Sequence, residues 1–535
     1  MSTTTVPNDT TTAARMAPAG RFARTREPRI PTSSQLYVWT RRDTIFTVVV
    51  AVLAFSTRFI GLTTATASGT PVFDEKHYVP QAWDMVRSWF NPVLGGIESN
   101  PGYGLVVHPP LAKQIEALGE QIFGYTPLGW RVMAALFGVA VVLLTMDLAR
   151  RLSHSPYVAL FAGILATCDG VLLVSSRFGM LDIFQVLFIV AASWALVLDN
   201  QQMDRRFWQW WLRHEDSEKW GPRAGFRWWR FACGVFLGLA LSVKWSGLYY
   251  MAFFGVLAVA MDAFRRRKFG IERPLVGALI RDSFPAFASL VILPVALYAW
   301  SWRAWFANET AAYRHAAEDG SIPADSVLRL LPDTPANWLY YHQSVLKFHE
   351  SLTTSSGHSH PWDSKPWAWL VSARPILYYS STDINCGDTT CRRMIYLFGT
   401  PAIWWLTVPV LLWATWALVI RRESNYLVPF VAFLAGFLPW LAAYDRQMYF
   451  FYATALAPMT IVMLSLILGT LWKSGRILAI ERLQKFAPGV SSGQAWVITY
   501  LAFVIAMFLY FAPILYGMQI TDSYYESLMW FPSWK

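Results

Sequence analysis

Two adjacent carboxylates, Asp74 and Glu75, are the first candidates for acid–base chemistry in this sequence. They occur in PVFDEKHYVPQAW, among the aromatic residues Phe73, Tyr78 and Trp83. A carboxylate in such surroundings can be partly desolvated, which adjusts its pKa and lets it serve as a general base. The simpler alternative is a pair of solvated acidic residues, and residue type alone does not decide between the two.

A second polar cluster, which combines a histidine with a lysine, follows in VVHPPLAKQIEALGEQIFG. Pro109 and Pro110 suit the first turn of a helix, which would place His108 and Lys113 close to its N-terminus. Basic groups in that position favour an anion site, to which Arg131 can also contribute. The alternative is an interfacial helix whose lysine extends its ammonium group towards water.

The richest run of polar and aromatic side chains is KFHESLTTSSGHSHPWDSKPWAWLVSARPILYY. Its candidate residues are His349, His360, Ser364, Lys365, Trp369 and Arg374. Arginine and lysine bind phosphate oxygens, whereas tryptophan and tyrosine cover a sugar or an isoprenoid, so this mixture favours a site for a phosphorylated sugar. The three histidines lack the spacing of metal ligands, and we predict no metal site.

Single charged residues near the ends of apolar segments complete the candidates. Arg446 in AAYDRQMYFFYATALAP can bind a phosphate or belong to an interfacial aromatic belt. Arg177 and Asp182 flank the turn SSRFGMLDIF and can either pair with each other or take part in function. Lys244 in LALSVKWSGLYY either extends to the membrane surface or faces a cavity.

These residues lie between long apolar segments. Of the 535 residues, 55% are apolar and only 15% are charged, against roughly 25% charged in a soluble protein. The apolar residues form runs mostly of 17 or more, long enough to cross a hydrocarbon core of about 30 Å. We therefore predict an all-α polytopic membrane protein with eleven spans, at residues 45–64, 132–149, 157–174, 181–198, 231–245, 247–264, 283–300, 396–420, 427–443, 448–471 and 495–513. The fifth and sixth spans are separated at Lys244, because one helix over 231–264 would be about 50 Å long.

The positive charges set the expected orientation. With the N-terminus inside, 28 of the 45 lysine and arginine residues lie on the cytoplasmic side. The positive-inside rule therefore predicts a cytoplasmic N-terminus and an outer C-terminus. The basic residues stand beside spans with no nucleic-acid-binding module around them, which excludes the nucleic-acid role that a net charge of +11 would otherwise suggest.

The same orientation divides the chain. Residues 1–44 have no apolar core and are predicted to be a disordered cytoplasmic tail without a cleavable signal peptide. Residues 45–300 would form an N-terminal membrane domain with a long outer loop at 65–130. A second outer loop at 301–395 precedes four spans in 396–535. Both loops are rich in Trp, Tyr and Pro, which favours helices lying at the membrane interface.

Cysteine usage agrees with this sidedness. Cys168 and Cys233 fall in spans, where a buried thiol behaves as a small hydrophobe. Cys386 and Cys391 lie in the outer sequence CGDTTC, where an oxidising compartment permits a disulfide. Metal binding is the weaker alternative, since only two thiols occur there and no histidine is close in sequence.

Taken in order, the motifs are similar to those of the protein O-mannosyltransferases, membrane glycosyltransferases of the GT-C class. The resemblance runs from about residue 45 to the C-terminus. It rests on FDE at Phe73, HPPLAK at His108, RFGMLD at Arg177, GLALSVKWSGL at Gly238, HPWDSKPWAWLVSARP at His360 and DRQMYFFY at Asp445. The chain lacks the long insertion between the seventh and eighth spans that holds a MIR domain in the eukaryotic enzymes, which fits the bacterial, actinobacterial-type branch.

The resemblance implies inverting transfer of mannose from polyprenyl-phosphate-mannose to Ser or Thr hydroxyls of exported polypeptides, on the outer face of the cytoplasmic membrane. Asp74 would be the catalytic base and Glu75 would orient the acceptor or substrate. The first outer loop would be catalytic, the second would bind donor and acceptor, and the last four spans would be the C-terminal mannosyltransferase region. Because phosphate is a good leaving group, it needs cations rather than an acid. The expected donor-binding residues are Arg131, Lys244, His360, Arg374, Arg446, His108 and Lys113, with Arg177, Asp182 and Trp369 in secondary or structural roles.

No cofactor or metal is expected, and the secretion channel is a further expected partner. The nearest rival function is a GT-C transferase that acts on a glycolipid, as the aminoarabinose transferases do, although the second outer loop and the last spans favour a protein acceptor. A secondary transporter is a more distant rival. It would need paired broken helices or inverted repeats near the bilayer midplane, whereas the ionisable residues gather at the outer face.

Overall fold

The computed structural model describes residues 37–89, 91, 93–98, 107–213, 219–478 and 489–535. Most of the tail predicted at 1–44 lies outside these residues. Its last residues belong to helix α1, Arg41–Phe59, which begins at a capping box in which Thr40 and Asp43 bond reciprocally. The first helix therefore starts at Arg41 rather than at residue 45, because the polar cap, and not the apolar run, sets its beginning.

Most of the described chain is helical, as predicted. The helices that overlap or adjoin the predicted spans are α1, α4 (Pro127–Ser153), α5 (Pro156–Thr167), α6 (Gly170–Ser175), α7 (Asp182–Arg213), α8 (Trp228–Val243), α9 (Gly247–Lys268), α10 (Pro274–Ala278), α11 (Phe284–Phe287), α12 (Leu293–Ser301), α16 (Pro401–Trp404), α17 (Thr407–Trp416), α18 (Leu427–Ala442), α19 (Leu456–Trp472) and α21 (Ser492–Tyr516). Short π-helical turns join α10 to α11 and α11 to α12 and extend α17.

Eight helical stretches of the described chain are long and apolar enough to cross a membrane. They are Pro127–Ser153, Asp182–Arg213, Gly247–Lys268, Pro274–Ser301, Pro401–Arg421, Ser424–Ala442, Phe450–Trp472 and Ser492–Tyr516. These stretches coincide with eight of the eleven predicted spans. The other three correspond to α1, which has charged residues at both ends, and to α5 and α8, which have 12 and 16 residues. The predicted break at Lys244 is confirmed, since α8 ends at Val243 and α9 begins at Gly247.

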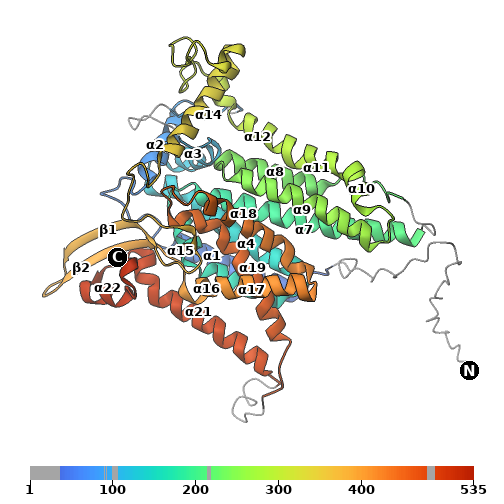
Figure 1. Ribbon diagram of the computed structural model, residues 1–535. Coiled ribbons are helices and arrows are strands. Elements are labelled where there is room, and N and C mark those ends of the chain that lie inside the picture. The colour runs from blue at the N-terminus through green and yellow to red at the C-terminus, as the bar shows by residue number, and fades with distance from the viewer. Residues whose placement is uncertain (1–36, 90, 92, 99–106, 214–218, 479–488) are drawn as a thin grey trace, which may run out of the picture. The chain divides into compact units, whose positions relative to one another are not determined.

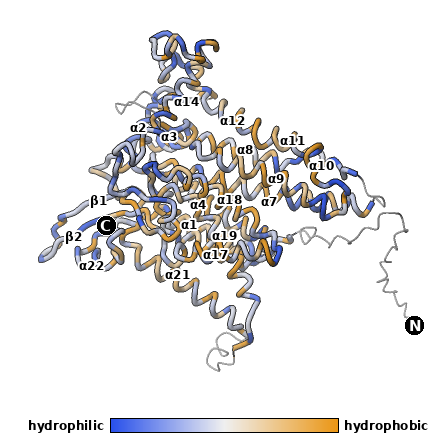
Figure 2. The backbone as a smooth tube through the Cα atoms, viewed as in Figure 1, coloured by the Kyte–Doolittle hydropathy of each residue, from blue (hydrophilic) through white to orange (hydrophobic). Residues whose placement is uncertain are grey.

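The segments predicted as outer loops contain shorter elements. These are α2 (Glu75–Arg87), α3 (Leu111–Phe123), α13 (Arg303–Ala307), α14 (Asp333–Ser351), α15 (Pro366–Trp369), the strands β1 (Ile376–Asn385) and β2 (Thr390–Leu397), and, near the C-terminus, β3 (Ile520–Thr521) and α22 (Asp522–Leu528). The three strands form one antiparallel sheet in the order β1-β2-β3. In Figure 1 the hairpin of β1 and β2 lies beside α22. Figure 2 shows that its tip is hydrophilic, whereas the long helices are largely hydrophobic.

The strands are a feature that the sequence analysis did not predict. The apolar residues at the end of β2 were included in the predicted span 396–420, but the helix begins only at Pro401. Cys386 and Cys391 are joined in a disulfide at the turn of the hairpin, with Cα atoms 5.9 Å apart. The first four residues of β1 are aliphatic or aromatic and are alternately buried and partly exposed, which suits a half-buried strand better than a helix.

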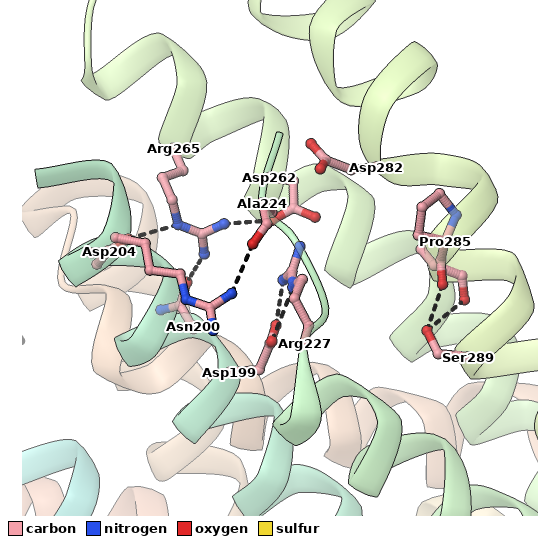
Figure 3. Close-up of polar contacts among 12 residues, drawn as sticks. Asp199, Asn200, Asp204, Ala224, Arg227, Asp262, Arg265, Asp282, Pro285 and Ser289 are labelled. Atoms are coloured by element: carbon pink, nitrogen blue, oxygen red, sulfur yellow. Dashed lines mark hydrogen bonds and ion pairs between the residues drawn. The ribbon is translucent and has the colours of Figure 1, made fainter. Parts of the chain in front are cut away.

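The chain forms two compact units. Among the described residues, the smaller contains 200–226 and 259–284, and the larger contains 37–199, 227–258 and 285–535. All the candidate site residues belong to the larger unit. In the smaller unit, Arg265 Nε donates to Asp204 at 2.8 Å, and the same guanidinium contacts Asn200 and Asp262 (Figure 3). Arg265, which the sequence suggested only as a signal of membrane orientation, is thus also paired inside the protein.

Two buried arginines close the ends of neighbouring helices in the larger unit. Arg177 donates to four carbonyl oxygens between Thr57 and Gly61, at 2.7–3.2 Å, where α1 ends. Arg58 in turn donates to the last two carbonyls of α5, at 2.9 and 3.1 Å. The last carbonyls of a helix have no partner within the helix, so these guanidinium groups satisfy them. Arg177 is therefore paired with backbone, and not with Asp182 as the sequence allowed.

We expect Arg177→Gln to lower the free energy of unfolding by more than about 3 kcal/mol, since a hydrogen bond to a charged group contributes about 1.5–3 kcal/mol and several are lost together. The measurement is denaturant unfolding of the purified protein in detergent. Arg87→Gln is the matched control, because Arg87 is exposed and its pair with Asp84 lies at the surface. Equal stability of the two variants would show that the contacts of Arg177 do not hold α1.

Candidate active site

Asp74 lies at the N-cap position of α2, directly after a residue with left-handed backbone. Phe73 has φ +53°, a conformation that a bulky L-residue keeps only when its surroundings enforce it. The Phe73 ring stacks on Tyr378 of β1, with centroids 4.3 Å apart, and meets Phe451 edge-on at 6.3 Å. These aromatic contacts hold the bend that presents Asp74, and such bends are frequent at functional sites.

The carboxylate of Asp74 is not used to cap the helix. It makes no hydrogen bond with any other described residue, and the side chain is half-buried. Burial raises the pKa of Asp74, while the nearby His77 and Lys244 act in the opposite direction. A carboxylate that is partly desolvated and has open acceptor sites is suited to take a proton from a substrate.

Glu75, the next residue, is fully buried and fully bonded. Its Oε1 accepts from Arg131 Nε at 2.7 Å and from the Gly179 amide at 2.8 Å. Its Oε2 accepts from Arg131 Nη2 at 2.7 Å and from the Val72 amide at 3.2 Å. Arg131 also donates to two backbone carbonyls of the segment after α1, at 3.0 and 2.8 Å. Glu75 and Arg131 were expected to contact substrate, but the structure pairs them with each other.

Lys244 occupies the turn between α8 and α9, as the sequence placed it. Its Nζ donates to Asp182 Oδ1 at 2.7 Å and lies 5.4 Å from the Phe451 ring centroid. The turn itself is held from α7, since Gln185 Nε2 donates to the Lys244 carbonyl at 3.0 Å and Ser246 Oγ donates to Gln185 Oε1 at 3.0 Å. The ammonium group is thereby fixed on the side where Asp74 lies.

His108, His349 and Arg446 form the second group of basic side chains at the site. Arg446 Nη2 donates to His349 Nδ1 at 2.9 Å, and the centroids of the two imidazole rings lie 5.9 Å apart. The His108 ring also lies 6.0 Å from that of Tyr78 in α2. Burial lowers the pKa of His108 well below its usual value and lowers that of His349 to about 4, in both cases with neighbouring cations acting in the same direction. Both imidazoles are therefore neutral near pH 7, and Arg446 carries the charge.

Helix α14 positions this group through a chain of hydrogen bonds. Trp245 Nε1 donates to the Tyr298 hydroxyl at 2.9 Å, and the hydroxyl is 2.6 Å from His342 Nε2. Nδ1 of His342 donates to the Trp338 carbonyl at 2.7 Å, so Nε2 accepts the hydrogen bond that the Tyr298 hydroxyl donates. Trp245 stacks on His342 and meets His349 edge-on, at 5.7 and 6.4 Å. Trp245, the residue after Lys244, is thus held in place by side chains of the second predicted outer loop.

The HPWDSK segment holds the backbone of Arg446. Asp363 Oδ1 accepts from the Met448 amide at 3.0 Å, and the Ser364 amide donates to the Met448 carbonyl at 2.8 Å. Lys365 Nζ donates to the Arg446 carbonyl at 3.0 Å. This segment was predicted to bind a ligand directly, but its Asp, Ser and Lys residues contact the chain around Arg446.

The remaining predicted donor-binding residues have partners elsewhere. Arg374 donates to the carbonyls of Ser533, Lys535 and Pro361. Lys113 is buried, pairs with Glu98 and donates to the His108 carbonyl at 3.2 Å. His360 is exposed and meets the ring of Tyr449 edge-on at 5.2 Å. Trp369, which was expected in a secondary or structural role, is fully buried, and its Nε1 donates to the Ser364 carbonyl at 3.0 Å.

The structure thus brings together Asp74, Lys244, Asp182, His108 and Arg446, which lie far apart in the sequence. It also brings in His349, a candidate of the polar run that was not assigned to the donor. It adds three residues that were not candidates, namely Trp245, Tyr78 and Tyr378, which stood among many aromatic residues with no distinguishing pattern. Within the described chain, no group of three or more His, Cys, Asp or Glu residues could hold a metal ion.

Two further carboxyl groups, Glu116 and Glu120, lie behind the Glu75–Arg131 pair on α3. Both are fully buried, and none of their oxygens has a partner among the described residues. Burial raises the pKa of Glu116 well above its usual value and raises that of Glu120 to about 9. An unpaired carboxylate is too costly to bury, so both groups are neutral acids near pH 7.

The fold and the site together define a polytopic membrane glycosyltransferase of the GT-C class. The S. cerevisiae protein O-mannosyltransferase Pmt1–Pmt2 complex bound to the sugar donor has a similar fold, with a TM-score of 0.68 over 94% of each chain and 15% sequence identity. Residues 48–306 match the family model described as dolichyl-phosphate-mannose-protein mannosyltransferase. Residues 335–534 match the model of the C-terminal four TMM region of protein-O-mannosyltransferase.

Bacterial relatives match over nearly the whole chain. A polyprenol-phosphate-mannose–protein mannosyltransferase of Corynebacterium glutamicum is 64% identical over 96% of this chain and 97% of its own length. One of Mycobacterium tuberculosis is 43% identical over 92% of both chains. The chain belongs to the protein O-mannosyltransferase family.

The raised pKa of Glu120 makes stability depend on pH in a defined direction. Between about pH 4.3, where an unfolded glutamate titrates, and about 9, the folded state holds a proton that the unfolded state has lost. The free energy of unfolding therefore decreases as pH rises through this window. We expect Glu120→Gln to remove this part of the decrease, so that its stabilisation over wild type grows from pH 5 to pH 9. Thermal unfolding in detergent across this range measures it. A difference that does not change with pH would contradict the neutral state of Glu120.

Proposed function

We propose that this protein transfers mannose from polyprenyl-phosphate-mannose to serine or threonine hydroxyls of exported polypeptides, with inversion at the anomeric carbon. The observation that carries the proposal is the half-buried carboxylate of Asp74, which has no hydrogen-bond partner in the described chain and lies near Lys244. The names of the relatives, polyprenol-phosphate-mannose–protein mannosyltransferases, support the donor and the protein acceptor.

Asp74 is the base of the proposed reaction. Its carboxylate accepts the proton of the acceptor hydroxyl while the hydroxyl oxygen forms a bond to the anomeric carbon. The bond between that carbon and the phosphate oxygen breaks on the opposite face, and its electron pair leaves with the polyprenyl phosphate. The transition state resembles an oxocarbenium ion, as in other inverting reactions at an anomeric carbon.

Lys244 and Arg446 supply the positive charge that the leaving phosphate requires. Lys244 already has one anionic partner, Asp182, whereas Arg446 pairs with a neutral imidazole and its Nε has no partner in the described chain. Arg446 therefore has the greater unused capacity for phosphate oxygens, and a guanidinium group can bind two of them side by side. His108 is neutral and contributes an N–H donor rather than charge, whereas His349, whose two nitrogens bond Arg446 and the Val107 backbone, holds Arg446 in place.

Glu75 and Arg131 act on the reaction indirectly. Their carboxylate and guanidinium groups are saturated by each other and by backbone. We assign them the role of holding the first turn of α2, so that the neighbouring Asp74 is fixed while its own carboxylate stays open. This replaces the substrate contacts that the family resemblance implied for both residues.

The site lies at the helix ends that the charge pattern places outside. Asp74 precedes α2, Lys244 follows α8, and Arg446 follows α18. The opposite ends of α4 and α9 carry clusters of basic residues in their last turns. This distribution supports an active site on the outer face of the cytoplasmic membrane. Acceptors would reach it as unfolded segments during export, which makes the secretion channel a partner of the proposed reaction.

We expect Asp74→Asn to lower the rate of mannosyl transfer by about 10²- to 10⁴-fold, the usual contribution of a general base. The assay uses membranes, polyprenyl-phosphate-mannose with labelled mannose and a threonine-rich peptide. Glu75→Gln is the matched control, because it should lower the thermal unfolding midpoint, whereas Asp74→Asn should leave it unchanged. Near-normal transfer by Asp74→Asn would exclude Asp74 as the base.

The pH dependence of the same reaction follows from the burial of Asp74. The raised pKa keeps this carboxyl protonated to a higher pH than an ordinary aspartate, whose pKa is about 3.9. Since only the deprotonated form can accept a proton, kcat/KM should fall as the pH decreases through the raised pKa. A rate profile that stays flat down to about pH 4 would contradict this assignment.

The identity of the acceptor separates the proposal from transfer to a glycolipid. In the same assay, label in the peptide supports the proposed function. Label that appears only in lipid products, with wild-type protein and peptide present, would favour the glycolipid transferase. A peptide with alanine in place of threonine is the control, because it lacks the hydroxyl that the reaction consumes.

A further inference from the structure

Two buried polar atoms next to Asp74 have no partner in the described chain. They are the hydroxyl oxygen of Tyr378, in β1, and Oδ2 of Asp182, at the start of α7. The two residues are only 3% and 6% exposed. A buried polar group without a hydrogen bond is costly, by about 1–3 kcal/mol, so these two atoms mark a place where the protein alone is incomplete.

Tyr378 is directed into the site by an irregularity of its strand. In the hairpin, Leu377 is opposite Tyr396 and Tyr379 is opposite Ile395, so Tyr378 is an extra residue without a partner on β2. Such a bulge re-aims a side chain and is frequent beside active sites. It places the ring of Tyr378 on Phe73, which precedes Asp74.

A second ring fixes Tyr378 from the other side. Phe178 meets it edge-on, with centroids 5.2 Å apart and an angle of 87° between the rings. Phe178 belongs to the turn that leads to Asp182. Tyr378 therefore lies between the residue before Asp74 and the turn before Asp182, and its ring contacts would be equally good for a phenylalanine. The hydroxyl group has no structural use in these contacts.

Asp182 offers one free carboxylate oxygen. Its Oδ1 accepts from Lys244 Nζ at 2.7 Å, and this pair fixes the orientation of the carboxylate. Oδ2 has acceptor capacity that no described residue uses. A fixed carboxylate oxygen next to a fixed phenol can bind two neighbouring hydroxyl groups of a ligand. The carboxylate oxygen accepts a hydrogen bond from one hydroxyl, and the phenol can donate a hydrogen bond to the other.

We propose that Tyr378 Oη and Asp182 Oδ2 bind hydroxyl groups of the donor hexose and hold its anomeric carbon between Asp74 and the cations. This inference rests on the proposed function, since it assigns the sugar subsite of the same reaction. Burial raises the pKa of Tyr378 well above its usual value, so its hydroxyl keeps the proton that it donates. The stacked rings of Phe73 and Tyr378 give the subsite an apolar wall.

The test combines Tyr378→Phe with donors that each lack one mannose hydroxyl. Tyr378→Phe keeps the stacked ring and removes only the hydroxyl. With the natural donor we expect kcat/KM for mannosyl transfer to fall about 10-fold, as for loss of one hydrogen bond to a buried polar group. With wild type, one deoxy donor should show a similar loss. With Tyr378→Phe, that same deoxy donor should cause no further loss.

Tyr379→Phe is the matched control. Tyr379 is the next residue of β1, pairs regularly with Ile395 and contacts neither Phe73 nor Phe178 in the described structure. It should retain wild-type kcat/KM and wild-type sensitivity to every deoxy donor. Asp182→Asn removes the carboxylate that contacts a second hydroxyl group of the sugar. A donor that lacks this second hydroxyl should therefore cause no further loss of kcat/KM in Asp182→Asn.

The outcomes separate this inference from the proposed function. Wild-type protein that transfers mannose, together with a Tyr378→Phe variant that keeps full activity, would overturn the subsite. A Tyr378→Phe variant that is less active but loses the same further factor with every deoxy donor would overturn it as well. Absence of transfer from polyprenyl-phosphate-mannose by wild type would instead overturn the proposed function on which the subsite rests.

Discussion

The buried ion pair of Glu75 and Arg131 is the constraint on which the site depends. It joins the start of α2, the start of α4, the Gly179 turn and the segment after α1 through hydrogen bonds of 2.7–3.2 Å. Removing one partner of such a pair leaves an uncompensated buried charge, at a cost of about 3–5 kcal/mol. Successive residues of a helix point about 100° apart, so Glu75 can be saturated in the interior while Asp74 stays open to a substrate. In the proposed reaction, the reactivity of Asp74 thus depends on the inertness of Glu75.

The cationic residues divide in the same way. Arg177 and Arg374 bind backbone carbonyls at the ends of segments, because a guanidinium group has five donors in a fixed plane and can satisfy several oxygens at once. Lys244 and Arg446 instead each donate a hydrogen bond to one side chain of another element. A phosphate needs donors that are positioned but not exhausted, and among the predicted cations only the second kind fits this description. The capacity of arginine to satisfy several carbonyls therefore explains why basic residues in prominent motifs have a structural use.

Most of the membrane architecture could be predicted from the sequence, because the length and hydropathy of a span are local properties. The break at Lys244 and the cysteine pair Cys386–Cys391 were visible for the same reason. The partners of Arg131 and Lys113 were not, since Arg131 and Glu75 are 56 positions apart and nothing local distinguishes a cation for phosphate from a cation for a carboxylate. The hairpin was missed because its apolar end resembles the start of a span. Asp74 could be proposed from the sequence only because two carboxylates stood together among aromatic residues.

The buried polar groups around the site that lack hydrogen-bond partners can avoid the cost of burial in two different ways. Glu116 and Glu120 can remove the cost of burial by taking up protons, and their raised pKa values show that they do so. Asp182 is different, because its Oδ1 is held by Lys244 at 2.7 Å while its Oδ2 has no partner in the described chain. The phenol of Tyr378 already holds its proton and still lacks an acceptor. A proton therefore completes the first pair of groups, whereas the second pair needs a molecule that brings both a donor and an acceptor, as the hydroxyl groups of the proposed sugar do.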